Sequence, residues 1–322
     1  MKDRCHREID YLRVSVTDRC NLRCVYCMPE AGVPWLPHAD LLSYEELLRL
    51  CRIFAGLGVK RVKLTGGEPL VRRGLPFLLA SLKAIDGIEA VTLTTNGVLL
   101  AAQLPDLLAA GLDGVNISLD TLDPVQFASL TRGEGLDRVL AGLDAALAAP
   151  GLTVKLNCVP LGRNDDQLLP LALLARDRRL AVRFIELMPI GPGKGLEPRS
   201  EAQVRRLLEA RLGPLLPREA PLGGGPCRYF SVPGFQGKLG FISAISHPFC
   251  SRCNRLRLTS TGFLKSCLQY ESGVPLKPLL SGADGGIRAA ILEAVSQKPS
   301  AHRFQAPEID GEETRTMSQI GG

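Results

Sequence analysis

The sequence predicts an α/β fold in which a parallel sheet curves into a partial (β/α)6 barrel of the TIM type, followed by a C-terminal extension. Two observations predict this class. Short strand-like runs alternate with longer helix-like runs six times before residue 190, and polar residues alternate with apolar ones along the strand-like runs. The first pattern is typical of parallel sheets. The second is unusual for a buried parallel strand, which is normally apolar on both faces, so one face is expected to border a polar space.

The six strand-like runs carry many β-branched residues. They cover residues 11–17, 59–65, 90–96, 113–120, 152–160 and 180–189. The first helix-like run covers residues 43–58, with Ser43 as its N-cap and Gly58 as its stop. Helices are also expected near residues 74–85 and 98–110, twice before residue 152 and once before residue 180. Six such units make either an open Rossmann-like sheet or most of a barrel.

The polar residues of the strands fall on one face. They are Arg13, Ser15, Thr17, Lys63, Thr65, Thr92, Thr94, Asn116, Ser118, Asp120, Thr153, Lys155, Asn157 and Arg183. The opposite face is Val, Leu and Ile, which suits covering helices. A half-solvated antiparallel sheet alternates in the same way, but the helical runs between the strands favour a parallel one. We therefore expect a barrel-like sheet with a polar, basic interior, whose Arg and Lys side chains indicate an anionic ligand.

The character of the chain changes after residue 190, which divides it into regions 1–190 and 191–322. A Gly-rich loop (191–195) and a helix near 200–211 are followed by Pro- and Gly-rich sequence. YFSVPG and GKLGFIS resemble short strands, and a helix is expected near 284–297. We expect this second region to pack against the open side of the first.

Composition narrows the class of protein. The chain has 322 residues and a net charge of +6, which suits an anionic small molecule as well as nucleic acid. Aromatic residues make up 5%, too few for a platform that stacks single-stranded bases. No run has the length of a signal peptide or a membrane span, so we expect a cytoplasmic protein without nucleic-acid or membrane partners. In a reducing compartment, ten clustered cysteines indicate metal binding or catalysis.

Two cysteine groups carry the main chemical signal. The first triad is Cys20, Cys24 and Cys27, in the loop after the first strand, where α/β barrels place their active sites. Structural zinc takes four closed ligands, whereas three thiolates on a four-iron cube leave one iron open for a substrate. A zinc site completed by a distant His, or buried structural cysteines, are the alternatives.

The second triad is Cys250, Cys253 and Cys267, again without an obvious fourth ligand. His247 could complete a Cys3His zinc site, but the repeated pattern suggests two clusters with different ligands. Arg255 and Arg257 follow on a strand, point the same way and suit forked phosphate contacts. The alternative for these arginines is a solvated basic edge. His6, His38 and His302 belong to no such group and are expected to have surface or structural roles.

The first triad, with an aromatic residue before its last cysteine, resembles the radical S-adenosylmethionine superfamily. LTGGEPLVR (64–72) resembles the glycine-rich segment of that superfamily. With TTNG, VNISLD, RFIELMPIG, CSRCNRLRLTSTG and the terminal IGG, the chain is similar over nearly its whole length to the GTP 3′,8-cyclases of molybdenum cofactor biosynthesis.

This resemblance implies two [4Fe-4S] clusters, one per triad, with S-adenosylmethionine on the first and the guanine of GTP on the second. It implies a radical cyclisation in which a deoxyadenosyl radical abstracts the C3′ hydrogen of GTP and C3′ bonds to C8. The S-adenosylmethionine site would be lined by Tyr26, Gly67, Ser118 and Met188. The GTP contacts would be Arg13, Lys63, Thr94, Lys155, Arg255 and Arg257. Arg183, Arg255 and Arg257 would have a catalytic part.

The resemblance also implies an electron donor, cyclic pyranopterin monophosphate synthase as the next enzyme, and a terminal Gly-Gly that reaches the active site; it leaves a homodimer open. The family often has Arg in the position of Lys63, where Lys keeps the charge without the fork. Two rival functions remain. One is a peptide-modifying radical enzyme with an auxiliary cluster, and the other is a zinc-stabilised nucleic-acid-binding protein.

Overall fold

The fold is built on one mixed sheet. The computed structural model describes residues 1–218, 222–306 and 311–321. The eight central strands are all parallel: β10 (Arg255–Leu258), β1 (Tyr11–Ser15), β2 (Arg61–Thr65), β3 (Ala90–Thr95), β4 (Gly114–Ser118), β5 (Thr153–Cys158), β6 (Ala181–Ile185) and β9 (Lys238–Ile242). Antiparallel strands continue the sheet at both ends: β11 (Phe263–Lys265) and β12 (Val274–Pro275) beyond β10, and β8 (Arg228–Ser231) and β7 (Leu216–Arg218) beyond β9. The predicted parallel α/β fold is confirmed.

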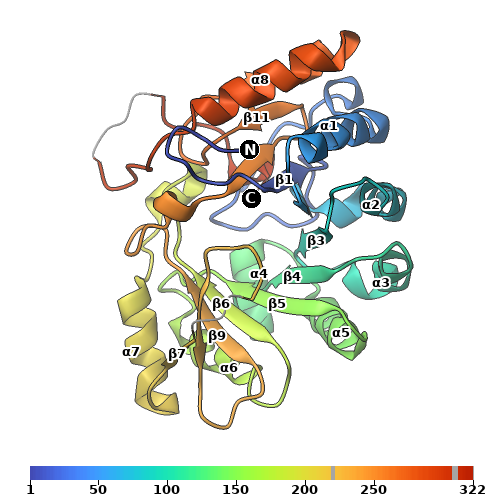
Figure 1. Cartoon of the computed structure of the whole chain (residues 1–322). Coiled ribbons are helices and arrows are strands. Elements are labelled where there is room, and N and C mark those ends of the chain that lie inside the picture. The colour runs from blue at the N-terminus through green and yellow to red at the C-terminus, as the bar shows by residue number, and fades with distance from the viewer. Residues whose placement is uncertain (219–221, 307–310, 322) are drawn as a thin grey trace.

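Helices connect the strands and cover the outside of the sheet (Figure 1). The α-helices are α1 (Tyr44–Gly56), α2 (Leu75–Lys83), α3 (Leu100–Ala109), α4 (Pro124–Thr131), α5 (Leu136–Ala148), α6 (Asp165–Leu173), α7 (Glu201–Leu212), α8 (Asp284–Ser296) and α9 (Met317–Ile320). Short 3-10 turns lie at η1 (His38–Asp40), η2 (Pro69–Val71), η3 (Gly191–Gly195), η4 (Cys250–Arg252) and η5 (Lys277–Ser281). None of the helices in the described residues is long and apolar enough to cross a membrane.

Local signals fix where the helices begin. The Ser43 hydroxyl accepts a hydrogen bond from the Glu46 backbone N–H at 3.1 Å, and the Glu46 carboxylate accepts one from the Ser43 N–H at 2.7 Å. This reciprocal capping satisfies two N–H groups that the first turn of α1 leaves without helical partners. The N-cap predicted at Ser43 is therefore confirmed.

The core lies between the sheet and these helices. Leu12, Val62, Leu64, Leu93 and Ile117, which alternate with the polar strand residues, are almost completely buried. Each fully buried side chain of this size contributes about 1.5–3 kcal/mol by leaving water. The period-two alternation therefore separates an apolar outer face, covered by helices, from a polar inner face.

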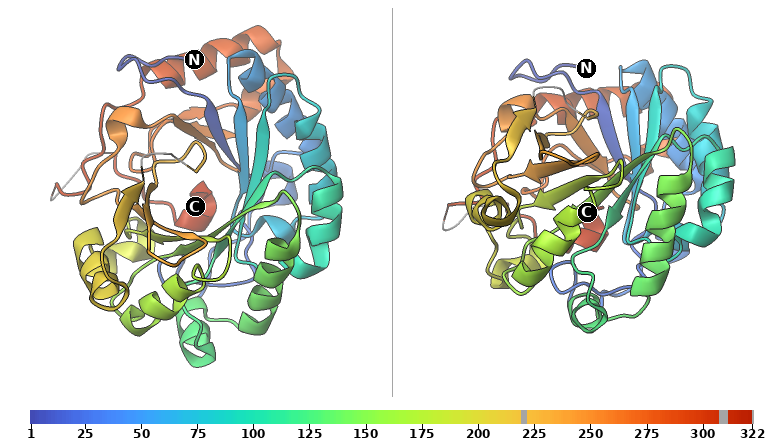
Figure 2. Two further views of the ribbon diagram at one scale, coloured as in Figure 1. Left: turned by 60° about the horizontal axis from the view of Figure 1, so that its bottom comes forward. Right: turned by 90° about the horizontal axis from the view of Figure 1, so that it is seen from below.

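Strands from the second half of the chain extend the parallel sheet at both of its edges. β9 pairs with β6, and β10 pairs with β1, with Arg257 beside Arg13. The eight parallel strands curve around a central space, which Figure 2 shows from two directions. Strands of regions 1–190 and 191–322 belong to one sheet. The division of the chain into two domains at residue 190 therefore stays a prediction.

The C-terminal end of the described chain enters the curved sheet, where α9 lies inside the ring of strands (Figure 2). The preceding segment is anchored by a fully buried ion pair, in which the Lys265 ammonium donates to the Glu313 carboxylate. Arg315 donates to the same carboxylate at 2.8 Å. These contacts set the direction from which α9 approaches the interior.

Candidate active site

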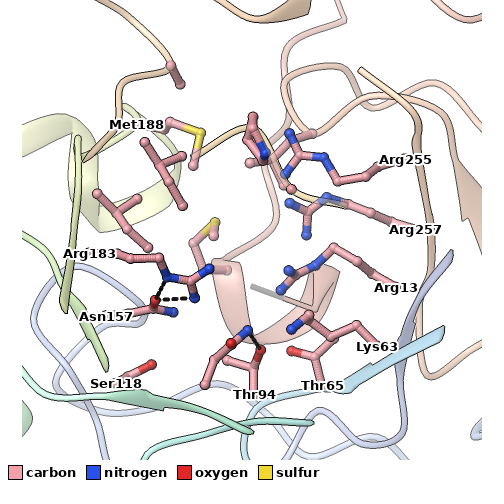
Figure 3. A pocket seen from close by; sticks show the side chains of 18 of the residues that line it. Arg13, Lys63, Thr65, Thr94, Ser118, Asn157, Arg183, Met188, Arg255 and Arg257 are labelled. Atoms are coloured by element: carbon pink, nitrogen blue, oxygen red, sulfur yellow. Dashed lines mark hydrogen bonds between the residues drawn. The ribbon is translucent and has the colours of Figure 1, made fainter. Parts of the chain in front are cut away.

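A cavity of about 810 Å³ occupies the interior of the curved sheet. It is lined by every residue that the sequence singled out as a site residue: Arg13, Cys20, Cys24, Tyr26, Cys27, Lys63, Gly67, Thr94, Ser118, Lys155, Arg183, Met188, Cys250, Cys253, Arg255, Arg257 and Cys267. Figure 3 shows the side chains from β1, β2, β10 and β6 converging on this space. The polar strand residues predicted from the alternation and the cysteines of the loops thus line the same cavity.

The first triad lies in the loop after the C-terminal end of β1. Around the cysteines this loop is tightly turned, with the Cys27 N–H donating to the Cys24 carbonyl at 2.9 Å and the Leu22 N–H donating to the Cys20 Sγ at 3.4 Å. The LTGGEP turn packs directly against it, because a Cβ on Gly67 would come within 2.4 Å of the Arg19 carbonyl oxygen. Only glycine allows that approach.

The thiols of the first triad lie in a setting that opposes their ionisation. Burial raises the pKa of Cys20 to about 11, with a smaller contribution from the Glu68 carboxylate. Burial and the neighbouring Cys20 raise the pKa of Cys27 to about 12, and burial also raises that of Cys24. Thiolates are the metal-ligating form, so these three side chains need a bound cation to ionise at neutral pH.

The arrangement fits a cluster of several irons. All ten cysteines are free thiols, and three of them meet at this one loop. An iron–sulfur cube is wider than an ion, and its cysteine ligands surround the cube instead of one centre.

The second triad reaches the cavity from a different direction. Cys250 and Cys253 belong to η4 and the residue after it, just before the N-terminal end of β10, and Cys267 follows β11. Burial alone would raise the pKa of Cys253, but the Lys298 ammonium and the Arg255 guanidinium lower it to about 7. The setting of this thiol is therefore cationic, unlike that of the first triad.

The histidine that contacts the second triad is not the one that the sequence suggested. The His247 imidazole lies 3.4 Å from the Glu201 carboxylate and is not among the residues lining the cavity. His302, expected to have a surface or structural role, lines the cavity instead, and its backbone N–H donates to the Cys250 Sγ at 3.5 Å. The expectation for His302 changes because the chain folds residues 298–302 against η4, which no local pattern indicates.

Cationic side chains form the wall between the triads. In the sheet register, Arg13 lies beside Lys63 on one side and Arg257 on the other, as Figure 3 shows. Burial, and then nearby cations, lower the pKa of Lys63 well below its usual value, and burial lowers that of Arg257 in the same way. Burial and the Arg183 guanidinium lower the pKa of Lys155 to about 8. So many like charges in one enclosed space are stabilised by an anion, which restores the charged forms.

The opposite wall carries polar side chains that hold one another in place. Arg183 donates to the Asn157 amide oxygen at 2.9 Å through Nε and at 2.5 Å through a second guanidinium nitrogen (Figure 3). The Tyr26 hydroxyl donates to the Asp120 carboxylate at 2.7 Å. Burial raises the pKa of Asp120 to about 6. These bonds orient Arg183 and Tyr26 toward the cavity.

Two buried carboxylates near the first triad received no role from the sequence. Asp120 was predicted to face the interior, and Glu68 lies within the quoted LTGGEP motif, but neither was assigned to the site. Glu68 accepts hydrogen bonds from the Thr95 hydroxyl and the Asn96 N–H, both at 2.7 Å, and burial raises its pKa to about 7. The available signal was their position at the C-terminal ends of parallel strands, where active-site residues gather.

The tail also reaches the site. The Arg257 guanidinium donates to the Gly321 carbonyl at 2.8 Å, and Met317 and Ser318 line the cavity. Gly321 adopts φ of +75°, and a Cβ there would approach the Ser15 side chain to 2.9 Å. Gly322, the other half of the predicted Gly-Gly tail, lies outside the described residues.

Comparisons with known proteins agree with these features. The family model of the radical SAM superfamily matches residues 14–175, and the model called Molybdenum Cofactor Synthesis C matches residues 180–304. A GTP 3′,8-cyclase of Pelotomaculum thermopropionicum is 47% identical, and one of Heliobacterium modesticaldum is 49% identical, each over 100% of both chains. The chain belongs to the GTP 3′,8-cyclase family. This membership supports the prediction of S-adenosylmethionine and of one iron–sulfur cluster.

A solved structure shares the fold of this cyclase-family chain at low sequence identity. Streptococcus suis SuiB bound to S-adenosylmethionine matches with a TM-score of 0.57 and 19% identity, covering 88% of this chain and 68% of that one. The likeness confirms the arrangement of strands and helices that the alternating pattern predicted.

Proposed function

We propose that the chain is a GTP 3′,8-cyclase, a radical S-adenosylmethionine enzyme that converts GTP to (8S)-3′,8-cyclo-7,8-dihydroguanosine 5′-triphosphate, the first step of molybdenum cofactor biosynthesis. The observation that carries this proposal is the shared cavity. Two cysteine triads from distant parts of the chain line it together with the cationic residues of β1, β2, β5, β6 and β10. The full-length similarity to proteins named GTP 3′,8-cyclase supports the same function.

The first triad would hold one [4Fe-4S] cluster, and Tyr26, Gly67, Ser118 and Met188 would line the S-adenosylmethionine site beside it. A cluster and S-adenosylmethionine held there would supply a 5′-deoxyadenosyl radical as the hydrogen-abstracting agent that C3′–C8 bond formation requires. The close packing at Gly67 leaves the backbone of the LTGGEP turn, instead of a side chain, facing the loop of the triad. Enclosure within the curved sheet limits the access of water to the reacting atoms.

The second triad would hold the second [4Fe-4S] cluster, with GTP bound between the two triads. Arg13, Lys63 and Lys155 would bind the triphosphate, and Thr94 would contact the same ligand. Arg and Lys suit this role because charge-assisted hydrogen bonds to phosphate are strong and forked ones fix orientation. Arg183 on β6 would take part in catalysis, and Asn157 orients it. Arg255 and Arg257, which would also take part, extend from β10.

The reaction also needs an electron donor, and its product would pass to cyclic pyranopterin monophosphate synthase. A homodimer stays a prediction. The protein's own contribution is positioning: cations on several strands fix the triphosphate, and the triads fix the two ends of the reacting pair.

The test is an anaerobic reaction of the iron-reconstituted chain with dithionite, S-adenosylmethionine and GTP carrying deuterium at C3′. We expect 5′-deoxyadenosine to form only when GTP is present, to carry the deuterium, and to appear with the cyclised nucleotide in the mass spectrum. Deoxyadenosine formed equally without GTP, or without deuterium, would contradict the proposal. ATP in place of GTP is the control for the base.

Metal analysis of the same sample separates the rival functions. Iron and sulfide in equal amounts, with no zinc, are expected of a cluster enzyme. Stoichiometric zinc at the second triad, lost on replacing His302 by Ala, would instead indicate a Cys3His structural site.

A further inference from the structure

The second triad is divided between two parts of the chain, and a third part touches both. Cys250 and Cys253 lie at η4, and Cys267 follows β11. The segment Lys298–His302 follows α8 and runs next to them. It contacts Cys250 itself and residues close to Cys253 and Cys267. Cysteines on two separate segments keep a common geometry only if something fixes the segments to one another.

Arg7 joins η4 to this segment from the N-terminal end of the chain. Its guanidinium donates to the Cys250 carbonyl at 2.8 Å, and to the carbonyls of Pro299 at 2.7 Å and Ser300 at 3.1 Å. Its Nε donates to the Asp3 carboxylate at 2.5 Å, and both side chains are almost completely buried. A buried guanidinium with this many acceptors holds its partners rigidly, because leaving any of its N–H groups unpaired is costly.

Lys298 joins the same segment to the other two cysteines. Its buried ammonium donates to the Arg255 carbonyl at 2.9 Å and to the Ser266 carbonyl, which is next to Cys267. The ammonium also lies close enough to the Cys253 thiol to lower its pKa. One positive charge is thus placed beside two thiols that would carry a cluster.

We propose that Arg7 and Lys298 are positioning residues of the second cluster: Arg7 fixes η4 to the Lys298–Ser300 segment, and Lys298 fixes that segment to Arg255 and Ser266, which lie close to Cys253 and Cys267 in the chain. The proposal rests on the proposed function, which assigns a cluster to the second triad. The two residues act through the cysteines and make no contact with the substrate in this role. Loss of either loosens the second triad and leaves the first intact.

The first test measures iron in Arg7→Met. Wild-type chain reconstituted anaerobically should hold about eight irons, and Arg7→Met about four, since each [4Fe-4S] cluster contributes four. Arg49→Met is the matched control, because Arg49 donates to the Leu280 and Gly282 carbonyls, both at 2.6 Å, on the outside of the fold. It should keep about eight irons. Eight irons in Arg7→Met would overturn the positioning role.

A second measurement needs no cluster, so it separates this proposal from the proposed function. In the metal-free chain, brief alkylation followed by mass spectrometry reports how open each cysteine is. Arg7→Met should raise the labelling rate of Cys250 and Cys253 about tenfold, because a lost charged hydrogen bond favours local opening by about that factor. Cys20 and the core residue Cys51 should keep their wild-type rates. Equal acceleration at Cys51 would indicate general unfolding and overturn the proposal.

The charge of Lys298 should affect the reduction midpoint of the second cluster, which can be measured by spectroscopy. A purely structural role of Lys298 would leave that midpoint unchanged. Lys298→Met removes a positive charge beside the second cluster, so the reduced cluster is less stabilised and its reduction midpoint falls, while that of the first cluster stays constant. If wild-type chain holds only four irons, the second cluster itself is refuted. If it holds eight and Lys298→Met leaves both midpoints unchanged, the proposed role of Lys298 is refuted.

Discussion

Replacing Lys63 by Met should make the substrate-free protein more stable and its binding of GTP weaker. Lys63 is buried, and burial is the main reason why the pKa of its ammonium is lowered. Four nearby cations lower that pKa further: Arg183, Arg13, Lys155 and Arg255. Met has a similar volume and no charge. Exchanging a buried charge for an apolar side chain often stabilises a fold by about 1–4 kcal/mol. Because Lys63 borders a cavity that screens its charge, we expect about 1–2 kcal/mol and a Tm rise of about 3 °C.

The same charge should strengthen GTP binding. A hydrogen bond to a charged group contributes about 1.5–3 kcal/mol, so Lys63→Met should weaken GTP binding by about tenfold to a hundredfold. Calorimetric titration without reductant measures this loss without turnover, and differential scanning calorimetry measures the gain in stability. Lys60→Met is the control, because Lys60 pairs with Glu89 at 2.9 Å on the surface. It should change neither quantity appreciably.

The stability of the wild-type protein should also depend on pH in a defined direction. The pKa of Lys63 lies well below 10.5 in the folded chain and near 10.5 in the unfolded chain. Between these values the unfolded chain binds more protons, so stability rises with pH, and Lys63→Met should flatten that rise. A Lys63→Met protein that unfolds more easily than wild type, or that binds GTP with unchanged affinity, would refute the reasoning.

Three other predictions concern separate parts of the site. Cys267→Ala should retain S-adenosylmethionine binding, measured by calorimetry, while GTP turnover is lost; equal loss of both would contradict separate roles for the triads. GTP affinity should fall above pH 8, by up to about tenfold per pH unit, because Lys155, whose pKa burial lowers to about 8, must regain a proton on binding. Titrations between pH 7 and 9 check this, and a flat profile would exclude it. Gly67→Ala should cost about 1–3 kcal/mol and weaken S-adenosylmethionine binding, since its Cβ would meet the Arg19 carbonyl oxygen at 2.4 Å. Gly195→Ala, where a Cβ meets nothing within 4 Å, is its control in thermal unfolding and binding assays.

The parts of the fold that depend on local pattern could be predicted from the sequence. The period-two alternation placed Arg13, Lys63 and Arg183 on the inner face of the sheet, because the side chain of every second strand residue must point the same way. Helix ends followed from capping residues such as Ser43, whose bonds lie within one turn. These inferences require no knowledge of which strands are neighbours.

The parts that depend on distant pairing could not be predicted in this way. Nothing local indicates that β10 lies beside β1, or that Arg7 binds the carbonyls of Cys250 and Pro299. A buried charged residue such as Lys298 is expected on the surface when only the sequence is known, because Lys is rarely buried without partners. Its partners here are backbone carbonyls, which no side chain in the sequence indicates. The position of the cysteines and cations that line the cavity was therefore predictable from the sequence, and the residues that hold them in place were much less so.

The pairing of β1 with β10 has a consequence for how the protein is made. During synthesis, Tyr11 leaves the ribosome early, but its neighbour Arg255 follows only after most of the chain. Until then β1 presents an unpaired edge, as does β6 before β9 arrives. Free edges of this kind invite aggregation, and pairings between distant segments form slowly. A chain interrupted near residue 190 would keep both edges exposed, so we expect it to be recovered mainly in inclusion bodies.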